Sequence, residues 1–232
     1  MSQTPTSKSG VAAAACKPLP TPQPQPQPPK LLLASTSRYR RELLQRLQWP
    51  FDVVAPQTEE RAEPGEQPAA LARRLALAKA HAVAALHPDA VVIGSDQVAD
   101  LDGEAIGKPG NHARATEQLQ RFSGRTVVFQ TAVAVVCLQT GFEQVELAPV
   151  AVQFRALSAT DIEQYLLLEQ PYDCAGSAKS ESLGIALLER IDSDDPSALV
   201  GLPLIRTCRM LRSAGIDPLG PNRAAGSTND HT

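Results

Sequence analysis

Apolar side chains recur along this chain with two spacings, which predict strands that alternate with helices. Short runs of Val, Ile and Leu are typical of buried strands, whereas apolar positions three and four residues apart are typical of one helix face. The predicted strands cover residues 31–34, 51–55, 90–94, 126–139, 143–155 and 184–190. The predicted helices cover residues 39–48, 68–86, about 113–122, 161–169 and about 203–214. This interleaving predicts an α/β domain with a mixed sheet.

Turn and capping residues mark several of the predicted boundaries. Ser37 is placed to cap the first helix, since its hydroxyl can accept a hydrogen bond from a free backbone N–H. Ser158 and Asp161 form a capping pair for the fourth helix. Asp102-Gly103 supplies the positive φ of a tight reversal, and Thr140-Gly141 joins the two longest strands as an antiparallel hairpin.

The two ends of the chain differ in composition from its middle. Residues 1–29 include an alternating Pro and Gln tract, which offers few backbone donors and little apolar surface to bury, so we expect a disordered arm. Residues 218–232 are rich in Gly, Asn, Ser and Thr, and we expect a flexible tail. The predicted folded domain therefore covers residues 30–217.

Composition and charge narrow the classes of function. A formal net charge of −3 argues against a nucleic-acid partner, because such proteins normally carry a basic face. No apolar run approaches the ~20 residues that span a bilayer, so we expect no membrane partner. The four cysteines are widely scattered, which favours packed, reduced thiols and a cytoplasmic location.

Two familiar motifs are only approximated. The segment from Gly103 to Pro109 resembles a phosphate-binding P-loop but is one residue short, with Pro where Ser or Thr must bind magnesium. Asp100 and Asp102 resemble the start of a calcium loop that lacks its remaining ligands. The four histidines form no metal-binding spacing.

The candidate chemistry is spread over several segments. The run at residues 90–94 stops at Ser95-Asp96-Gln97, and a carboxylate released at a strand end either caps a turn or holds a cation. The start of the first helix is basic, which is typical of an anion site and also of a plain solvated face. Lys79 lies in an apolar stretch, where a snorkelling lysine is the alternative. Carboxylates and cations that converge at strand ends suit a magnesium-bound polyphosphate. The residues in question are Ser35, Ser37, Arg40, Arg41, Glu60, Lys79, Asp96 and Lys108.

One set of motifs runs in order through nearly all of residues 30–217. The motifs are Leu33-Ala-Ser35-Thr-Ser37, Arg40-Arg41, Glu60, Lys79-Ala80, Gly94-Ser-Asp96-Gln97-Val98, Gly107-Lys108-Pro109, Ser123-Gly124-Arg125, Thr131, Ala175-Gly-Ser177, Lys179-Ser180-Glu181 and Gly184. Together they resemble the Maf family of nucleoside triphosphate pyrophosphatases. Gln97 and the Lys-Ser-Glu segment resemble the branch that acts on 7-methyl-GTP.

The resemblance implies a Maf/ITPase-like mixed sheet flanked by helices, with a cleft between two lobes. It also implies hydrolysis between the α and β phosphates of a nucleotide with a divalent cation such as Mg²⁺, Mn²⁺ or Co²⁺. The residues that match the family are assigned by position. Asp96 would accept the proton, Glu60 and Asp96 would hold the metal, Lys79 and Lys108 would act on the phosphates, and Ser35, Ser37, Arg40 and Arg41 would bind substrate.

Base selection is carried over onto Tyr39, Gln97 and Glu181. Methylation at N7 makes guanine cationic, so Tyr39 would stack on the base and Glu181 would pair with it. Two positions depart from the family pattern. Arg38 stands where Pro is common, and Tyr39 stands where this branch carries Trp.

Three alternatives remain open from the sequence. The same chemistry could act on dTTP, UTP or CTP, against which Gln97 and Glu181 argue. The chain could instead be a nucleotide-binding regulator of cell division and septum formation, or could bind a partner through its Pro and Gln arm. Oligomeric state is open, with a homodimer as one candidate.

Overall fold

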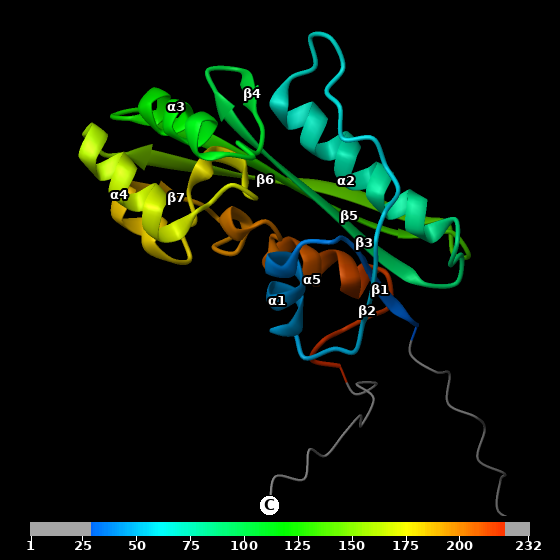
Figure 1. The fold of residues 1–232 in the computed structure, drawn as a ribbon. Helices are drawn as coiled ribbons and strands as arrows, with labels where there is room; N and C mark the ends of the chain where they lie inside the picture. The colour runs from blue at the N-terminus through cyan, green and yellow to red at the C-terminus, as the bar shows by residue number, and fades with distance from the viewer. Residues whose placement is uncertain (1–28, 221–232) are drawn as a thin grey trace, which may run out of the picture.

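The computed structural model describes residues 29–220, in which seven strands form one mixed sheet flanked by helices (Figure 1). The strand order is β2-β1-β3-β5-β6-β7, with β4 paired to β3. The strands are β1 (Leu31–Ala34), β2 (Asp52–Val54), β3 (Val91–Leu101), β4 (Glu104–Ile106), β5 (Thr126–Cys137), β6 (Phe142–Phe154) and β7 (Leu188–Asp192). The pairs β1·β2 and β1·β3 are parallel and the others antiparallel, which confirms the predicted mixed α/β fold.

Helices cover both faces of the sheet (Figure 1). They are α1 (Arg38–Gln45), α2 (Pro68–Ala84), α3 (His112–Phe122), α4 (Ala159–Glu169) and α5 (Leu204–Ser213). Short 3₁₀ helices occupy η1 (Ala175–Ser177), η2 (Leu183–Leu187) and η3 (Ala198–Val200). No helix in residues 29–220 is long and apolar enough to cross a membrane. The expectations for the arm and for most of the tail concern residues 1–28 and 221–232, outside the described part.

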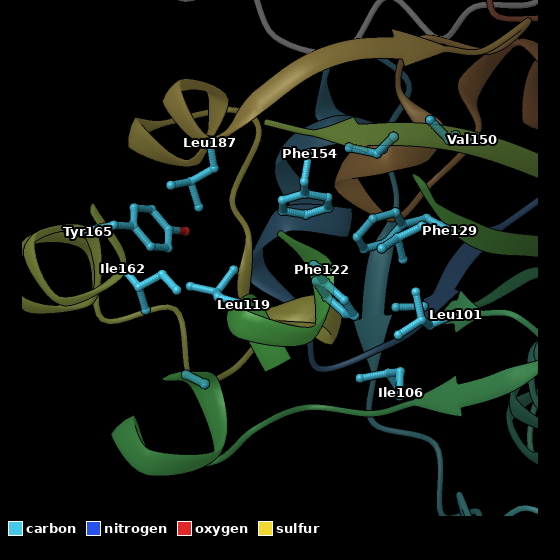
Figure 2. Close-up of a cluster of buried hydrophobic side chains, with 14 of the residues drawn as sticks. Leu101, Ile106, Leu119, Phe122, Phe129, Val150, Phe154, Ile162, Tyr165 and Leu187 are labelled. Atoms are coloured by element: carbon cyan, nitrogen blue, oxygen red, sulfur yellow. The ribbon is translucent and has the colours of Figure 1, made fainter. Parts of the chain in front are cut away.

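Three clusters of buried side chains divide the sheet into two halves. One half carries α2 on one face and α1 with α5 on the other, each over its own apolar cluster. In the other half, α3, α4 and the long strands share one cluster, in which the rings of Phe122 and Phe154 lie 5.3 Å apart (Figure 2). The domain therefore has two lobes connected by β3, β5 and β6.

The predicted turns and caps are largely confirmed. Ser37 caps α1, and Ser158 forms a capping box with Asp161, so that α4 begins two residues earlier than predicted. Asp102 and Gly103 both have positive φ at the reversal between β3 and β4. The strand predicted at residues 184–190 is wrong at its start, because 3₁₀ helix η2 occupies that stretch and β7 begins only at Leu188.

The expected end of a strand at Gly94 is also wrong. Strand β3 continues through Ser95, Asp96 and Gln97 to Leu101, because β5 pairs with it from Val92 to Asp100. Strand β1 nevertheless ends beside Gly94, since its last pair joins Ala34 to Gly94. Asp96 therefore lies two residues beyond the carboxyl end of the parallel part of the sheet, although it does not end its own strand.

One edge of β3 is open between its two partners on that side. Strand β1 pairs with Val91–Gly94, and β4 pairs with Ala99–Leu101, while β5 occupies the opposite edge throughout. Within the described part of the chain, no strand thus lies beside residues 95–98 on the β1 and β4 edge. This gap interrupts the sheet between its two lobes.

Helix α2 lies very close to β3 at Gly94. A Cβ atom at Gly94 would stand 2.2 Å from the carbonyl oxygen of Ala76 and 2.7 Å from the backbone nitrogen of Ala80. Only glycine allows this approach, and the alanines on α2 bring the two backbones together. The same approach sets the distance between α2 and the open part of β3.

We expect Gly94→Ala to lower the free energy of unfolding by about 3 kcal/mol, because the added methyl overpacks rigid backbone. The measurement is urea denaturation followed by circular dichroism. Gly107→Ala is the matched control, since a Cβ there meets no atom within 4 Å. Equal stabilities for the two variants would contradict the close packing of α2 on β3.

Candidate active site

A cavity of about 690 Å³ lies at the gap in the sheet, and we call it the cleft. Both lobes contribute to it: the turn from β1 into α1 and one side of α2 belong to one lobe, and the segment after β4 belongs to the other. Most of the predicted site residues line the cleft, namely Ser35, Ser37, Tyr39, Arg40, Glu60, Lys79, Asp96, Gln97 and Lys108. The structure therefore brings together residues that are far apart in the sequence, Asp96 and Lys108 among them.

Lys79 holds two carboxylates at the α2 side of the cleft. Its Nζ lies 2.7 Å from Asp96 Oδ1 and 2.6 Å from Glu60 Oε1. Lys79 and Asp96 are only 4% and 7% exposed, so the lysine does not snorkel to solvent. A buried charge requires a partner, and each of these two supplies the other's.

The charges around Glu60 determine its protonation. Burial alone would raise the pKa of Glu60, but the hydrogen bond and charge of Lys79, with the charges of Lys108 and Arg40, hold the pKa below its ordinary value. Burial lowers the pKa of Arg40, an effect that Asp96 and Glu60 oppose. This part of the cleft thus brings the cations of Lys79, Arg40 and Lys108 close to the carboxylates of Glu60 and Asp96.

Neighbouring residues of β3 point to opposite faces of the sheet. Asp96 faces α2, whereas Gln97 faces Thr131 of β5 and the carbonyls of η3, to which its Nε2 donates. Both side chains line the cleft because the missing strand opens the sheet between its two faces. The cleft consequently has a charged wall on the α2 face and a largely neutral wall on the η3 face.

The carbonyl of Gly201 ties the helix α1 to the η3 segment. Arg40 Nε donates to this oxygen at 2.8 Å. The one hydroxyl proton of buried Ser95 is shared between this oxygen, 2.9 Å from Oγ, and Ala132 O, 2.8 Å from Oγ. Ser37 Oγ meanwhile accepts from Arg40 N. Arg40 is therefore anchored through both its backbone and its guanidinium while it lines the cleft.

Tyr39 lies at the rim of the cleft among charged groups. The guanidinium carbon of Arg38 is 4.8 Å from the centre of its ring, and Lys179 Nζ is 6.0 Å away. The Tyr39 hydroxyl is 3.4 Å from Asp173 Oδ2, and Asp173 itself lines the cleft. A cationic base would meet two cations at this ring, together with one carboxylate.

Two predicted residues do not line the cleft. Arg41 is exposed on α1. Glu181 lines a second cavity of about 370 Å³, which Leu199 and Val200 also line. Burial raises the pKa of Glu181, and the carboxylates of Glu169 and Asp173 add to this effect. The expected pairing of Glu181 with a base in the cleft therefore has no support from its position.

Several cleft residues had no role in the sequence-based prediction. Asp173 and Cys174 follow α4 in a segment without a clear pattern, and burial, with the charge of Asp173, raises the pKa of Cys174 to about 12. Residues 198–201 contribute backbone carbonyls, which no side-chain pattern reveals. The sequence Gly201-Leu-Pro203 before a helix was the available signal of a turn at this point.

The donor set of the cleft suits a metal that is shared with phosphates. Asp96 and Glu60 face each other across Lys79 Nζ, and Mg²⁺ is commonly held by one or two carboxylates with substrate phosphates completing the shell. No group of three or more His, Cys, Asp or Glu residues that could hold a metal occurs within residues 29–220. The residues thus fit a cation that arrives with a polyphosphate.

Comparisons with known proteins agree with this geometry. A family model described as Maf-like protein matches residues 30–214. The chain is similar to proteins named 7-methyl-GTP pyrophosphatase from three bacteria. It is 67% identical to that of Albidiferax ferrireducens over 191 residues, which cover 82% of this chain and 96% of the relative. It is 68% identical to that of Polaromonas sp. over 186 residues (80% and 85%), and 58% identical to that of Bordetella pertussis over 193 residues (82% and 95%).

We expect the stabilisation contributed by ionised Glu60 to disappear in acid. Its pKa is lower in the folded state, so the contribution is complete above the unfolded-state pKa of about 4.3 and is lost as the pH falls through the folded-state value. The measurement is the difference in unfolding free energy between the parent and Glu60→Gln, from about pH 7 to about pH 3. Glu59→Gln controls for removal of a carboxylate from the same loop. A difference that grows toward acid would contradict the arrangement.

Proposed function

The chain belongs to the Maf-like protein family, and we propose that it is a nucleoside triphosphate pyrophosphatase that converts 7-methyl-GTP to 7-methyl-GMP and pyrophosphate. The observation that carries the proposal is the cleft in which Lys79 joins Glu60 and Asp96 beside Arg40 and Lys108. Hydrolysis of a triphosphate requires cationic side chains along the phosphates and a group that accepts a proton from the attacking water. The charged wall of the cleft offers both.

Asp96 is the proposed proton acceptor. Its Oδ1 accepts a hydrogen bond from Lys79. Its Oδ2 makes no hydrogen bond with any described residue and is not fully buried, so it is open to the cleft. A water oxygen attacks the α-phosphorus as its proton passes to Oδ2. The bond between the α-phosphorus and the bridging oxygen breaks, and that oxygen leaves with pyrophosphate.

Cationic side chains would bind the phosphates and offset the charge on the leaving pyrophosphate. Arg40 is held by Gly201 O, and its other guanidinium donors have no partner among the described residues, so they would be available to phosphate. Lys108 lies in the loop after β4. Ser35 and Ser37 lie at the start of α1, where free N–H groups favour anions. Lys79 would keep Asp96 and Glu60 in place.

A divalent cation, Mg²⁺, Mn²⁺ or Co²⁺, is part of this proposal. Asp96 and Glu60 would hold it together with phosphate oxygens, and it would supply neutralisation of phosphate charge. Lys79 now occupies the position between the two carboxylates.

The proposed cellular setting is the cytoplasm. The described cysteines, Cys137, Cys174 and Cys208, are all free thiols, in keeping with a reducing compartment. A homodimer remains a proposal for solution measurements. The same chemistry on dTTP, UTP or CTP is the alternative substrate class, and a regulator of septum formation is the alternative function.

We expect pyrophosphate release from 7-methyl-GTP in the presence of Mg²⁺, and a loss of about 10³-fold in kcat for Asp96→Asn, because the amide cannot accept the proton. The measurement is a pyrophosphate assay over a panel of nucleoside triphosphates. Asp100→Asn is the matched control, since Asp100 is on the same strand and face but outside the cleft. Release of single phosphates, or full activity of Asp96→Asn, would overturn the proposal.

The adjacent arginines of α1 give a second test. We expect Arg40→Gln to raise the KM at least tenfold, because it removes a charged donor to phosphate, worth about 1.5–3 kcal/mol. Arg41→Gln should keep the parent KM, since Arg41 is exposed and outside the cleft. Equal losses in the two variants would show that the substrate reaches Arg41. Thermal unfolding of both variants verifies that they are folded.

A further inference from the structure

The side-chain amide nitrogen of Gln97 has two hydrogens, which three acceptors on the η3 face share. Its Nε2 lies 2.9 Å from Thr131 Oγ1 and 3.0 Å from the carbonyl oxygens of both Ala198 and Leu199. Thr131 is fully buried, and its hydroxyl donates to Ala198 O at 3.0 Å. The hydroxyl proton of Thr131 is therefore committed, and a lone pair of Oγ1 is left to accept from Gln97.

These contacts determine which end of the amide faces the cleft. A flip of the amide, a rotation of about 180° around the last side-chain bond, would place Gln97 Oε1 against two carbonyl oxygens. Thr131 would not compensate, because its hydroxyl proton is already donated to Ala198 O. Within residues 29–220, Oε1 has no hydrogen-bond partner, and it is not among the buried unpartnered atoms. Oε1 therefore remains open to the cleft that Gln97 lines.

We propose that Thr131, with the carbonyls of Ala198 and Leu199, is a positioning residue that fixes Gln97 Oε1 as a hydrogen-bond acceptor for N–H groups of the nucleobase. The inference rests on the proposed function and extends it to the atoms that read the base. A carbonyl oxygen has two lone pairs, and a guanine-type ring presents two adjacent donors, N1–H and the exocyclic amine. The match depends on these donors and not on the charge of the ring.

The positions of the charged wall and the neutral wall of the cleft support binding of the phosphates at the first and of the base at the second. Asp96 and Gln97 are neighbours on β3 and point to opposite faces, so a nucleotide whose phosphates lie beside Lys79 has its base directed through the gap toward η3. The η3 segment is itself fixed to β3 through Ser95 and Gly201. Gln97 thus stands on a rigid support.

The first experiment compares 7-methyl-GTP with 7-methyl-ITP, which lacks the exocyclic amine, and with the N1-methylated analogue of 7-methyl-GTP. The parent should lose about tenfold in kcat/KM with at least one analogue, as for one lost hydrogen bond. Gln97→Leu should hydrolyse that analogue and 7-methyl-GTP with nearly equal kcat/KM. Equal rates for all three substrates in the parent, or a preference that persists in Gln97→Leu, would overturn the inference.

The second experiment tests Thr131 with two variants. Thr131→Val removes the hydroxyl at nearly constant volume and should bring the ratio of kcat/KM for 7-methyl-GTP over the sensitive analogue close to one, whereas Thr131→Ser keeps the hydroxyl and the ratio. A purely structural role would lower both rates and leave the ratio unchanged, which would overturn the positioning role. If Thr131→Val does not fold, Thr131→Ala takes its place, with the same expected ratio close to one. No pyrophosphate from any nucleotide refutes the proposed function itself, while pyrophosphate without discrimination refutes only this inference.

Discussion

Among residues 29–220, strand β3 has a neighbouring strand on only one edge between Gly94 and Ala99, because β1 ends at Ala34 and the pairing with β4 begins at Ala99. The cleft depends on this interruption. A continuous sheet would separate the α2 face from the η3 face. Neighbouring side chains of β3 point to opposite faces, so they could then not line the same cavity. Strand β5 keeps β3 extended across the gap, so Asp96 and Gln97 stay in fixed positions while the edge beside them is open. A rigid strand thereby carries side chains that line one site from two faces of the sheet.

Charge burial imposes the second constraint on this region. Removing Lys79 and Asp96 from water is costly unless each remains paired, and their contact at 2.7 Å requires α2 to lie close to β3. Gly94 and the small residues of α2 permit that approach. Glu60 adds a second carboxylate from an exposed loop, so the second ion pair of Lys79 lies at the surface of the cleft and not inside the core. The packing of an apolar helix thus determines the geometry of the most polar part of the molecule.

Much of this was predictable from the sequence, and the failures have physical causes. The spacing of apolar residues gave the order of helices and strands, and Ser37 and Ser158 marked two helix starts. The end of β3 was misplaced because Ser95, Asp96 and Gln97 interrupt an apolar run, whereas long antiparallel pairing with β5 outweighs that local signal. The buried state of Lys79 depends on Asp96, 17 residues away, which no local pattern encodes. Glu181 is assigned by its position along the chain, and the fold places it on a second cavity together with Leu199 and Val200.

The surroundings of Tyr39 bear on how a cationic base could be recognised. Stacking on a tyrosine favours a cation through the negative face of the ring, but Arg38 and Lys179 already lie near that ring. Lys179 is buried and forms ion pairs with Glu169 and Asp173, whereas Arg38 is exposed and donates a hydrogen bond to the Tyr39 hydroxyl. Asp173 then becomes the carboxylate nearest to a stacked base, since its Oδ2 already reaches the Tyr39 hydroxyl. On this proposal, Tyr39 and Asp173 at the rim would recognise the positive charge of the nucleobase. Gln97, further along β3, would recognise its N–H donors. On the proposed function, the contact at the rim would separate a methylated guanine from its neutral parent by charge. The contact with Gln97 would separate either guanine from bases that lack its two adjacent donors.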